Sequence, residues 1–202
     1  MSRFSFLLRL PVVLFLAHAY VAARLALAVP AGTRWLIPVF LLLVYVLILA
    51  GFLMRRSGSK PGGDAMAWAG FIALGLFSWL FVLSVIRDIL LVAGYIASTV
   101  ADTAALPAHL QSFATYSAIA IPLLSVIAVL IGLWNARRLA RVVDVDIALP
   151  GLPPALQGFT IVQISDVHVG PTIKRQYVQA IVDAVNRLAP DVVAITGDIV
   201  DG

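Results

Sequence analysis

The sequence predicts two regions of different fold class: an all-α bundle of three or four transmembrane helices over residues 1–141, and an α/β region over residues 142–202. Composition supports the first, because 62% of the chain is hydrophobic and 12% charged, with a mean hydropathy of +1.04. A soluble domain is about half apolar and about a quarter charged. Local pattern supports the second, because short strand-like runs around an amphipathic segment replace the long apolar runs.

Uninterrupted apolar runs predict the membrane helices, since about 20 apolar residues are needed to cross a bilayer. Three runs reach this length, near residues 35–54, 66–86 and 113–134. They contain the charge-free cores of three spans. The bundle therefore has at least three helices.

A fourth run, near residues 10–29, is less uniform because His18 and Arg24 interrupt it. One interpretation is another span. The other is a signal peptide, with a basic start, a short apolar core and a small-residue cleavage site at Ala17–Ala19. The apolar run continues past that site, which favours the span.

Basic residues predict the orientation of the bundle, since Lys and Arg are enriched in cytoplasmic loops. With four spans, Arg34 and Arg87 fall on one side. The other side receives Arg3, Arg55, Arg56, Lys60, Arg137, Arg138 and Arg141. We therefore expect a cytoplasmic C-terminal region and a location in the inner membrane. Removing the first segment would leave the C-terminal side unchanged.

The Arg87-Asp88 dipeptide interrupts apolar sequence that resumes at Ile89. An ionisable pair inside a membrane is a functional candidate. Alternatively the third span ends there and the helix continues along the interface, which we favour. Adjacent residues do not face each other on a helix, so we expect no ion pair between these two. We assign no role to His18 or His109.

Charge separates the two regions further. Residues 1–141 carry 11 Lys and Arg against three Asp, whereas residues 142–202 carry three against seven. The basic excess lies in the apolar region, where it indicates membrane topology rather than nucleic-acid binding. The chain has no cysteine, which excludes disulfides and thiolate metal sites.

Two strands are predicted before residue 166. Alternating apolar residues over 143–149 are typical of a half-exposed strand, which ends at the Pro/Gly-rich stretch 150–154. Residues 159–165 are rich in branched and aromatic side chains and predict a buried strand.

A helix and another strand follow. From Ile173 to Leu188 the apolar residues form one helical stripe, with Thr172 as a plausible N-cap and Pro190 beyond the end. Residues 191–196 predict the next strand. A helical connection of this length makes the two flanking strands parallel, with a right-handed crossover.

Asp166, His168 and Asp198 follow the ends of these two strands, in the sequences Ser-Asp-Val-His and Gly-Asp. Parallel strands end at the same edge of a sheet, where open α/β sheets bind ligands. Neighbouring strands are about 4.8 Å apart, so both carboxylates can reach one cation. Each short motif alone is common in turns, but their combination predicts a metal site.

The stretches "IVQISDVHVG" and "DVVAITGDIVDG" resemble the first two motifs of the calcineurin-like metallophosphoesterases. The resemblance is closest to the bacterial membrane-anchored branch, and it covers residues 141–202. It implies a four-layer α/β sandwich with a dinuclear metal centre. It also implies that Asp166 and His168 bind one metal and that Asp198 bridges both, whereas Asp201 is not expected to be a ligand.

The later motifs of this family are an Asn-His pair, a further His and a Gly-His-x-His. None of them precedes Gly202. The chain is therefore expected to be the N-terminal part of a longer enzyme, with the proton-donating His beyond Gly202, and to be inactive alone. Such a chain is a fragment, a truncated product or a mis-assigned end.

The resemblance implies hydrolysis of a phosphomonoester or phosphodiester with two divalent metal ions. Mixed carboxylate and imidazole ligands suit Mn, Fe or Zn. The expected partners are the lipid bilayer and a phosphoester substrate, for which a membrane tether suits a lipid-linked compound; no protein partner is inferred. The alternative is a non-enzymatic membrane protein whose helical bundle carries the function and whose phosphoesterase tail is vestigial.

Overall fold

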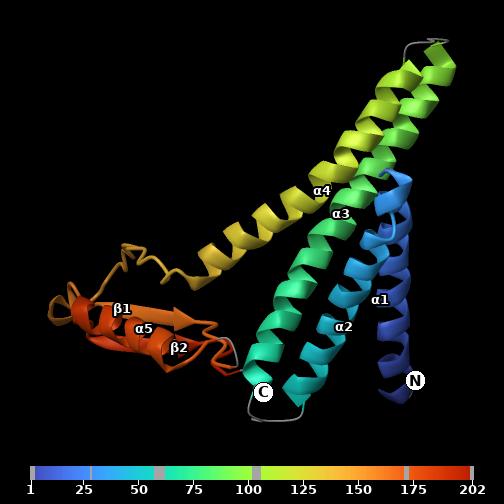
Figure 1. Ribbon diagram of the computed structural model, residues 1–202. Helices are drawn as coiled ribbons and strands as arrows, with labels where there is room; N and C mark the ends of the chain where they lie inside the picture. The colour runs from blue at the N-terminus through green and yellow to red at the C-terminus, as the bar shows by residue number, and fades with distance from the viewer. Residues whose placement is uncertain (1–2, 28, 57–61, 102–105, 171–172, 201–202) are drawn as a thin grey trace. The chain divides into compact units, whose positions relative to one another are not determined.

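The computed structural model describes residues 3–27, 29–56, 62–101, 106–170 and 173–200 (Figure 1). The chain divides into two compact units, residues 1–135 and 136–202, and each is described by itself. Unit 1 is helical. Unit 2 contains a parallel two-stranded sheet and a helix. The predicted fold class is therefore confirmed.

Unit 1 contains helices α1 (Arg3–Ala26), α2 (Leu36–Arg56) and α3 (Gly63–Ala101), and α4 (Leu106–Arg137) begins in it. A short 3₁₀ turn, η1 (Ala31–Thr33), separates α1 from α2. Among the described residues, four helical stretches are long and apolar enough to cross a membrane. The first of them lies in α1, which packs against α2 and α3.

Helix α3 continues beyond the predicted span, which ended at Ile86. Its 39 residues extend about 58 Å at 1.5 Å per residue, whereas the hydrocarbon core of a bilayer is about 30 Å thick. Apolar residues follow Asp88 and no proline interrupts the helix, which explains its continuation to Ala101. Such a helix must tilt strongly or project from the bilayer.

The buried core of unit 1 draws residues from all four helices. It comprises Val21, Leu25, Leu41, Val44, Ile48, Ala73, Phe77, Leu80, Ala118 and Ile121. His18, for which the sequence suggested no role, stacks on Phe77 with ring centroids 3.5 Å apart, and its Nδ1 lies 2.7 Å from the Leu14 carbonyl. It is a packed core histidine.

Small residues allow α2 and α3 to approach closely. A Cβ added to Gly70 would lie 2.7 Å from the Cα of Gly51, and one added to Gly51 would lie 2.8 Å from the Cα of Gly70. Helix pairs in membranes use small residues in this way, because van der Waals packing is a main source of their association.

Asp88 is the centre of a polar cluster in the bundle. Its carboxylate accepts hydrogen bonds from Tyr20 Oη at 2.7 Å and from Arg24 Nε at 2.6 Å. Arg87 Nη1 lies 3.2 Å from Asp88 Oδ1, and Arg87 also donates to Ser117 Oγ and to the Ala114 carbonyl, both at 2.9 Å. The cluster thus joins α1, α3 and α4.

The expectation that Arg87 and Asp88 form no ion pair was wrong. The Arg87 side chain is long enough to bend toward the neighbouring carboxylate, which Arg24 of α1 already holds in place. Arg87 is 5% exposed, so its charge requires partners within the bundle.

Unit 2 is built on strands β1 (Ile161–Ser165) and β2 (Val192–Thr196), which pair in parallel with Ile161 opposite Val192. Helix α5 (Arg175–Leu188) connects them. Its predicted stripe is partly confirmed, because Tyr177, Ile181 and Val185 are half-buried whereas Leu188 is 42% exposed. A 3₁₀ turn, η2 (Pro154–Leu156), precedes β1.

Three expectations for unit 2 need correction. Residues 143–149 form no strand and are exposed, because no described strand pairs with them. Strand β1 alternates between exposed and half-buried residues instead of being buried, because α5 is the one α-helix that lies wholly within the described residues of this unit. Helix α5 begins at Arg175 after an extended Lys174, not at Ile173, while Thr172 lies outside the described residues.

Candidate metal centre

The two predicted ligand motifs meet at the carboxyl ends of β1 and β2. The Asp166 amide donates to the Thr196 carbonyl at 3.3 Å, and the His168 amide donates to the Asp198 carbonyl at 3.1 Å. The parallel pairing continues to Val169 and Val200. The backbone therefore brings Asp166, His168 and Asp198 to one edge of the sheet, as the strand–helix–strand pattern predicts.

Asp166 and His168 both have left-handed backbone conformations, with φ of 54° and 53°. Non-glycine residues rarely adopt positive φ, although Asp and His do so more often than most. Ala189 is the other described non-glycine residue with this conformation, and it caps α5. Unusual backbone geometry is concentrated at functional sites. Its presence at two predicted ligands therefore supports the hypothesis that this loop is functional.

Gly197 makes room for the Asp166 carboxylate. A Cβ at Gly197 would lie 2.5 Å from Asp166 Oδ1 and 2.9 Å from Oδ2. Gly197 itself has a φ of 71°, which side-chain-bearing residues seldom adopt. The glycine of the Gly-Asp sequence thus admits the carboxylate of the other loop, and the next residue, Asp198, donates its backbone amide to that carboxylate.

The carboxylate of Asp166 is held in its ionised form. The Ser165 hydroxyl donates to Oδ2, and the Asp198 amide donates to Oδ1 at 3.3 Å. These two hydrogen bonds, in that order of importance, lower the pKa of Asp166 below its usual value, and the nearby His168 lowers the pKa further. At neutral pH this edge of the sheet therefore carries an ionised carboxylate whose oxygens can bind a cation.

Carboxylate oxygens and an imidazole nitrogen are suitable ligands for a divalent cation, and the backbone brings Asp166, His168 and Asp198 to the same edge of the sheet. Even so, the described residues contain no group of three His, Cys, Asp or Glu side chains placed to hold a metal ion. The Asp166 carboxylate accepts from Ser165 and the Asp198 amide instead. Asp201, which was not expected to be a ligand, lies outside the described residues.

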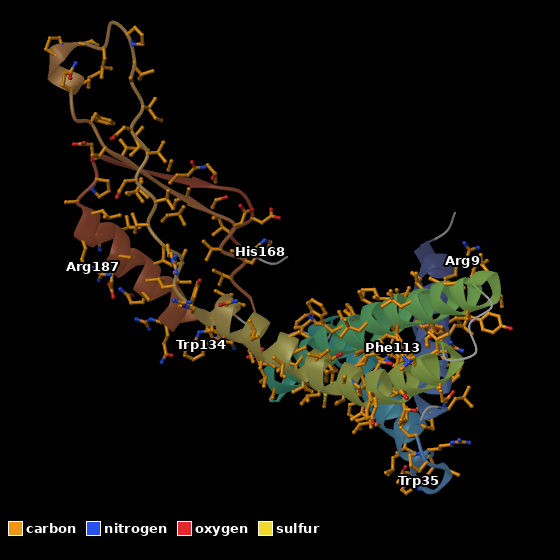
Figure 2. All side chains as sticks on the ribbon, turned by 90° about the horizontal axis from the view of Figure 1, so that it is seen from above. Arg9, Trp35, Phe113, Trp134, His168 and Arg187 are labelled. Carbon is orange, nitrogen blue, oxygen red and sulfur yellow. The ribbon has the colours of Figure 1, made fainter. Side chains whose placement is uncertain are left out.

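Sequence reasoning missed the role of Ser165. The signal was present, because a hydroxyl residue directly before an aspartate can hydrogen-bond to that carboxylate. Figure 2 labels His168 beyond the end of the sheet, on the loop that also carries Asp166.

Comparison with known proteins gives relatives of a single kind. The chain is 50% identical over 70 residues to a Danio rerio protein named "Transmembrane protein with metallophosphoesterase domain", covering 35% of this chain and 16% of the relative. A Bos taurus protein of the same name is 37% identical over 91 residues, or 45% and 20% of the two chains. A Caenorhabditis elegans protein named as a metallophosphoesterase is 26% identical over 145 residues, or 72% and 30%.

Matches over 91 and 145 residues are longer than unit 2, residues 136–202, so part of each must lie in the helical unit 1. The chain spans less than a third of the length of each of these relatives. No protein-family model matches the chain, and no solved structure matches it.

Proposed function

We propose, from the premise that this chain is related to metallophosphoesterases with membrane helices, that it forms the anchor and the first part of a metal-dependent phosphoesterase. The substrate class is a phosphomonoester or phosphodiester. The observation that carries the proposal is the placement of Asp166 over Gly197, beside the Asp198 backbone, at the carboxyl edge of parallel strands.

This placement supports metal binding for a physical reason. Two carboxylates on adjacent loops repel each other, and a cation between them removes the repulsion. We propose Asp166 and His168 as ligands of one ion and Asp198 as a ligand shared by two, with Mn, Fe or Zn as the metal. When bound, such ions neutralise phosphoryl charge and lower the pKa of a coordinated water.

The remaining chemistry belongs to the protein groups described above. Ser165 and the Asp198 amide keep the Asp166 carboxylate ionised and oriented. Gly197 lets it approach the neighbouring loop. Residues 1–202 contain the first two motifs that the resemblance names and none of the later ones, so we expect no turnover from a polypeptide of these residues alone.

The membrane helices define where the activity takes place. The distribution of Arg and Lys supports a C-terminal region on the cytoplasmic side of the inner membrane. A phosphoesterase tethered there suits a lipid-linked phosphoester. A reporter that is active only outside the cytoplasm, fused after Arg141, is expected to give no signal.

The decisive experiment uses the longest in-frame product of the gene, in membranes. After metal removal by a chelator, hydrolysis of a chromogenic phosphodiester is measured with Mn, Fe or Zn restored. Asp166→Asn should abolish the metal-dependent rate. Asp183→Asn is the matched control, because Asp183 lies on α5 and hydrogen-bonds to Gln179 at 2.9 Å, away from the site.

Metal-independent hydrolysis, or equal loss in both variants, would contradict the proposal. A complete product without any turnover would instead favour the alternative, a non-enzymatic membrane protein. That alternative finds some support in the polar cluster around Asp88, because ionisable groups inside a bundle are candidates for function.

A further inference from the structure

We propose that unit 2 has a lipid-docking surface, the exit patch, which binds the anionic headgroups of the bilayer next to helix α4. The patch consists of Arg137, Arg138, Arg141, Lys174 and Arg175. The partner is an anionic phospholipid surface. The inference does not depend on the proposed phosphoesterase activity.

The first observation is a hydrogen bond that joins two distant stretches of unit 2. Tyr177 Oη of α5 donates to the Arg138 carbonyl at 3.3 Å, across 39 positions of sequence. Arg138 directly follows Arg137, the last residue of a helix apolar enough to span a membrane. The first turn of α5 is therefore tied to a residue that chain connectivity keeps near the bilayer surface.

The second observation is the charge that this hydrogen bond assembles. All five patch side chains are exposed, and the nearest acidic residues that follow along the described chain are Asp144, three positions after Arg141, and Asp183, eight positions after Arg175. The sequence assigned only the three arginines after α4 to the membrane boundary. The hydrogen bond adds Lys174 and Arg175, which are more than 30 positions away along the chain.

Charge complementarity identifies the partner. Clusters of four to eight basic residues directly beside a transmembrane helix bind anionic lipids, and each residue near the surface raises the affinity roughly fivefold. A small soluble anion can contact one or two of these basic side chains, whereas a surface of lipid headgroups can contact all five. The patch therefore fits a bilayer better than a small soluble phosphate.

Docking would also orient the candidate site. In a strand–helix–strand unit the connecting helix starts at the carboxyl edge of the strands, so α5 begins on the edge that carries Asp166 and Asp198. This edge would then lie near the headgroups, where phosphoesters of lipids are found. That last consequence rests on the proposed function, while docking itself does not.

The test uses the full 202-residue chain in lipid nanodiscs. Because the chain has no cysteine, one introduced cysteine can carry a nitroxide label at a chosen place. Gln176→Cys reports on the first turn of α5 and Asn186→Cys on its last turn, and both positions are exposed. Collision with lipid-soluble oxygen, compared with a water-soluble nickel chelate, measures the depth of each label.

Discs of phosphatidylcholine alone are compared with discs in which about a third of the lipid is phosphatidylglycerol. We expect the label at Gln176 to enter the headgroup layer only in the anionic discs at roughly 0.1 M salt, and to leave it near 1 M, where the Debye length falls to about 3 Å. The label at Asn186 should not respond. Added glycerol phosphate should not displace the label at Gln176.

Two sets of variants identify the residues responsible. Lys174→Gln with Arg175→Gln should lower the ratio of docked to undocked α5 about 30-fold. Tyr177→Phe, which removes only the hydroxyl, should reduce docking without changing charge. Arg187→Gln removes a positive charge on the same helix outside the patch, and it should have no effect; Arg187 is labelled in Figure 2.

Several results would overturn the inference. The label at Gln176 could respond equally in both disc types, or Arg187→Gln could reduce docking as strongly as the patch variants. Displacement by glycerol phosphate would assign the patch to a soluble anion. Because depth is measured without any substrate, failure here is distinct from failure of the proposed phosphoesterase activity.

Discussion

The two units expose apolar side chains for different reasons. In unit 1 the carboxylate of Asp88 is directed at Tyr20 and Arg24 of α1, while Leu123 is 62% and Trp134 70% exposed. Unit 2 leaves Ile161 63% and Ile195 62% exposed although polar groups also lie on its surface. Lipid can cover the first set, whereas another layer of protein would be expected to cover the second.

This difference shows that exposure has to be interpreted together with the positions of the polar groups. A bundle that satisfies its ionised groups internally suits a bilayer, where water cannot do so. A two-stranded sheet with one connecting helix leaves apolar surface that a further layer of protein would bury. Four experiments test this comparison, from the largest expected effect to the smallest.

The largest effect is expected from Asp198→Asn in the longest in-frame product. The variant keeps the size of the side chain but removes the charge that is proposed to lie between two cations. A metal ion contributes several kcal/mol of charge stabilisation, and about 4 kcal/mol is a thousandfold in rate. Phosphodiester turnover should fall at least about a thousandfold, and bound metal, measured by elemental analysis, should fall toward one or none.

His168→Ala tests whether loss of a ligand to one ion has a smaller effect than loss of the shared ligand. It removes a ligand of one proposed ion and leaves the shared carboxylate intact, so excess Mn should restore part of the activity. Near-normal turnover together with two bound metals in Asp198→Asn would refute the shared role.

The next effect is expected from Asp88→Ala in unit 1. The change leaves Arg87, which is 5% exposed, without its anionic partner, and it removes the acceptor of Tyr20 and Arg24. Breaking a buried ion pair costs about 3–5 kcal/mol. Unfolding in detergent, followed by circular dichroism, should show a loss in this range.

Ser78→Ala on the same helix is the control. Ser78 is exposed, and its hydroxyl donates to the Leu74 carbonyl one turn away. Equal stability of the Asp88 and Ser78 variants would mean that the polar cluster does not hold the bundle together.

A smaller effect is expected from Gly70→Ala at the crossing of α2 and α3. The added methyl would lie 2.7 Å from the Cα of Gly51 and 2.9 Å from the Leu47 carbonyl. Overpacking of this kind costs about 1–3 kcal/mol. The same unfolding assay should separate it from Gly132→Ala, where nothing lies within 4 Å of the added methyl; indistinguishable variants would exclude tight packing at the crossing.

Much of the architecture was predictable because it depends on periodicity. Long apolar runs indicate the helices of unit 1, and the strand–helix–strand pattern indicates that β1 and β2 are parallel. The parallel arrangement alone places Asp166 and Asp198 at one edge. These features follow from local sequence and from rules of chain connection.

The errors concern interactions between distant parts of the chain. Residues 143–149 alternate like a strand, but a strand also needs a neighbour to pair with, and the sequence pattern does not supply one. Arg87 and Asp88 interact because Arg24, 64 positions away from Asp88, fixes the carboxylate. The contact between the Asp166 carboxylate and Gly197 likewise depends on loop conformation, which periodicity does not determine.

The smallest effect concerns the other edge of the sheet, where Asp191 joins the two strands. Its Oδ2 accepts from the Thr160 amide at 2.7 Å and from the Thr160 hydroxyl at 3.0 Å. These hydrogen bonds lower the pKa of Asp191 below its usual value, and the bond from the Thr160 amide has the larger effect. The ionised group therefore stabilises the folded unit above the pKa of the unfolded chain, about 3.9. This contribution is lost as the pH falls through the lower, folded-state pKa.

We expect hydrogen exchange of the Thr160 amide, corrected for the intrinsic rate, to be protected near neutral pH and to lose part of that protection at strongly acidic pH. Asp191→Asn should give a weaker protection that no longer varies with pH in this range. Because the group is exposed, the change should be modest. An Asp183→Asn control should retain the wild-type profile, and a pH-dependent loss that persists in Asp191→Asn would assign it to another carboxylate.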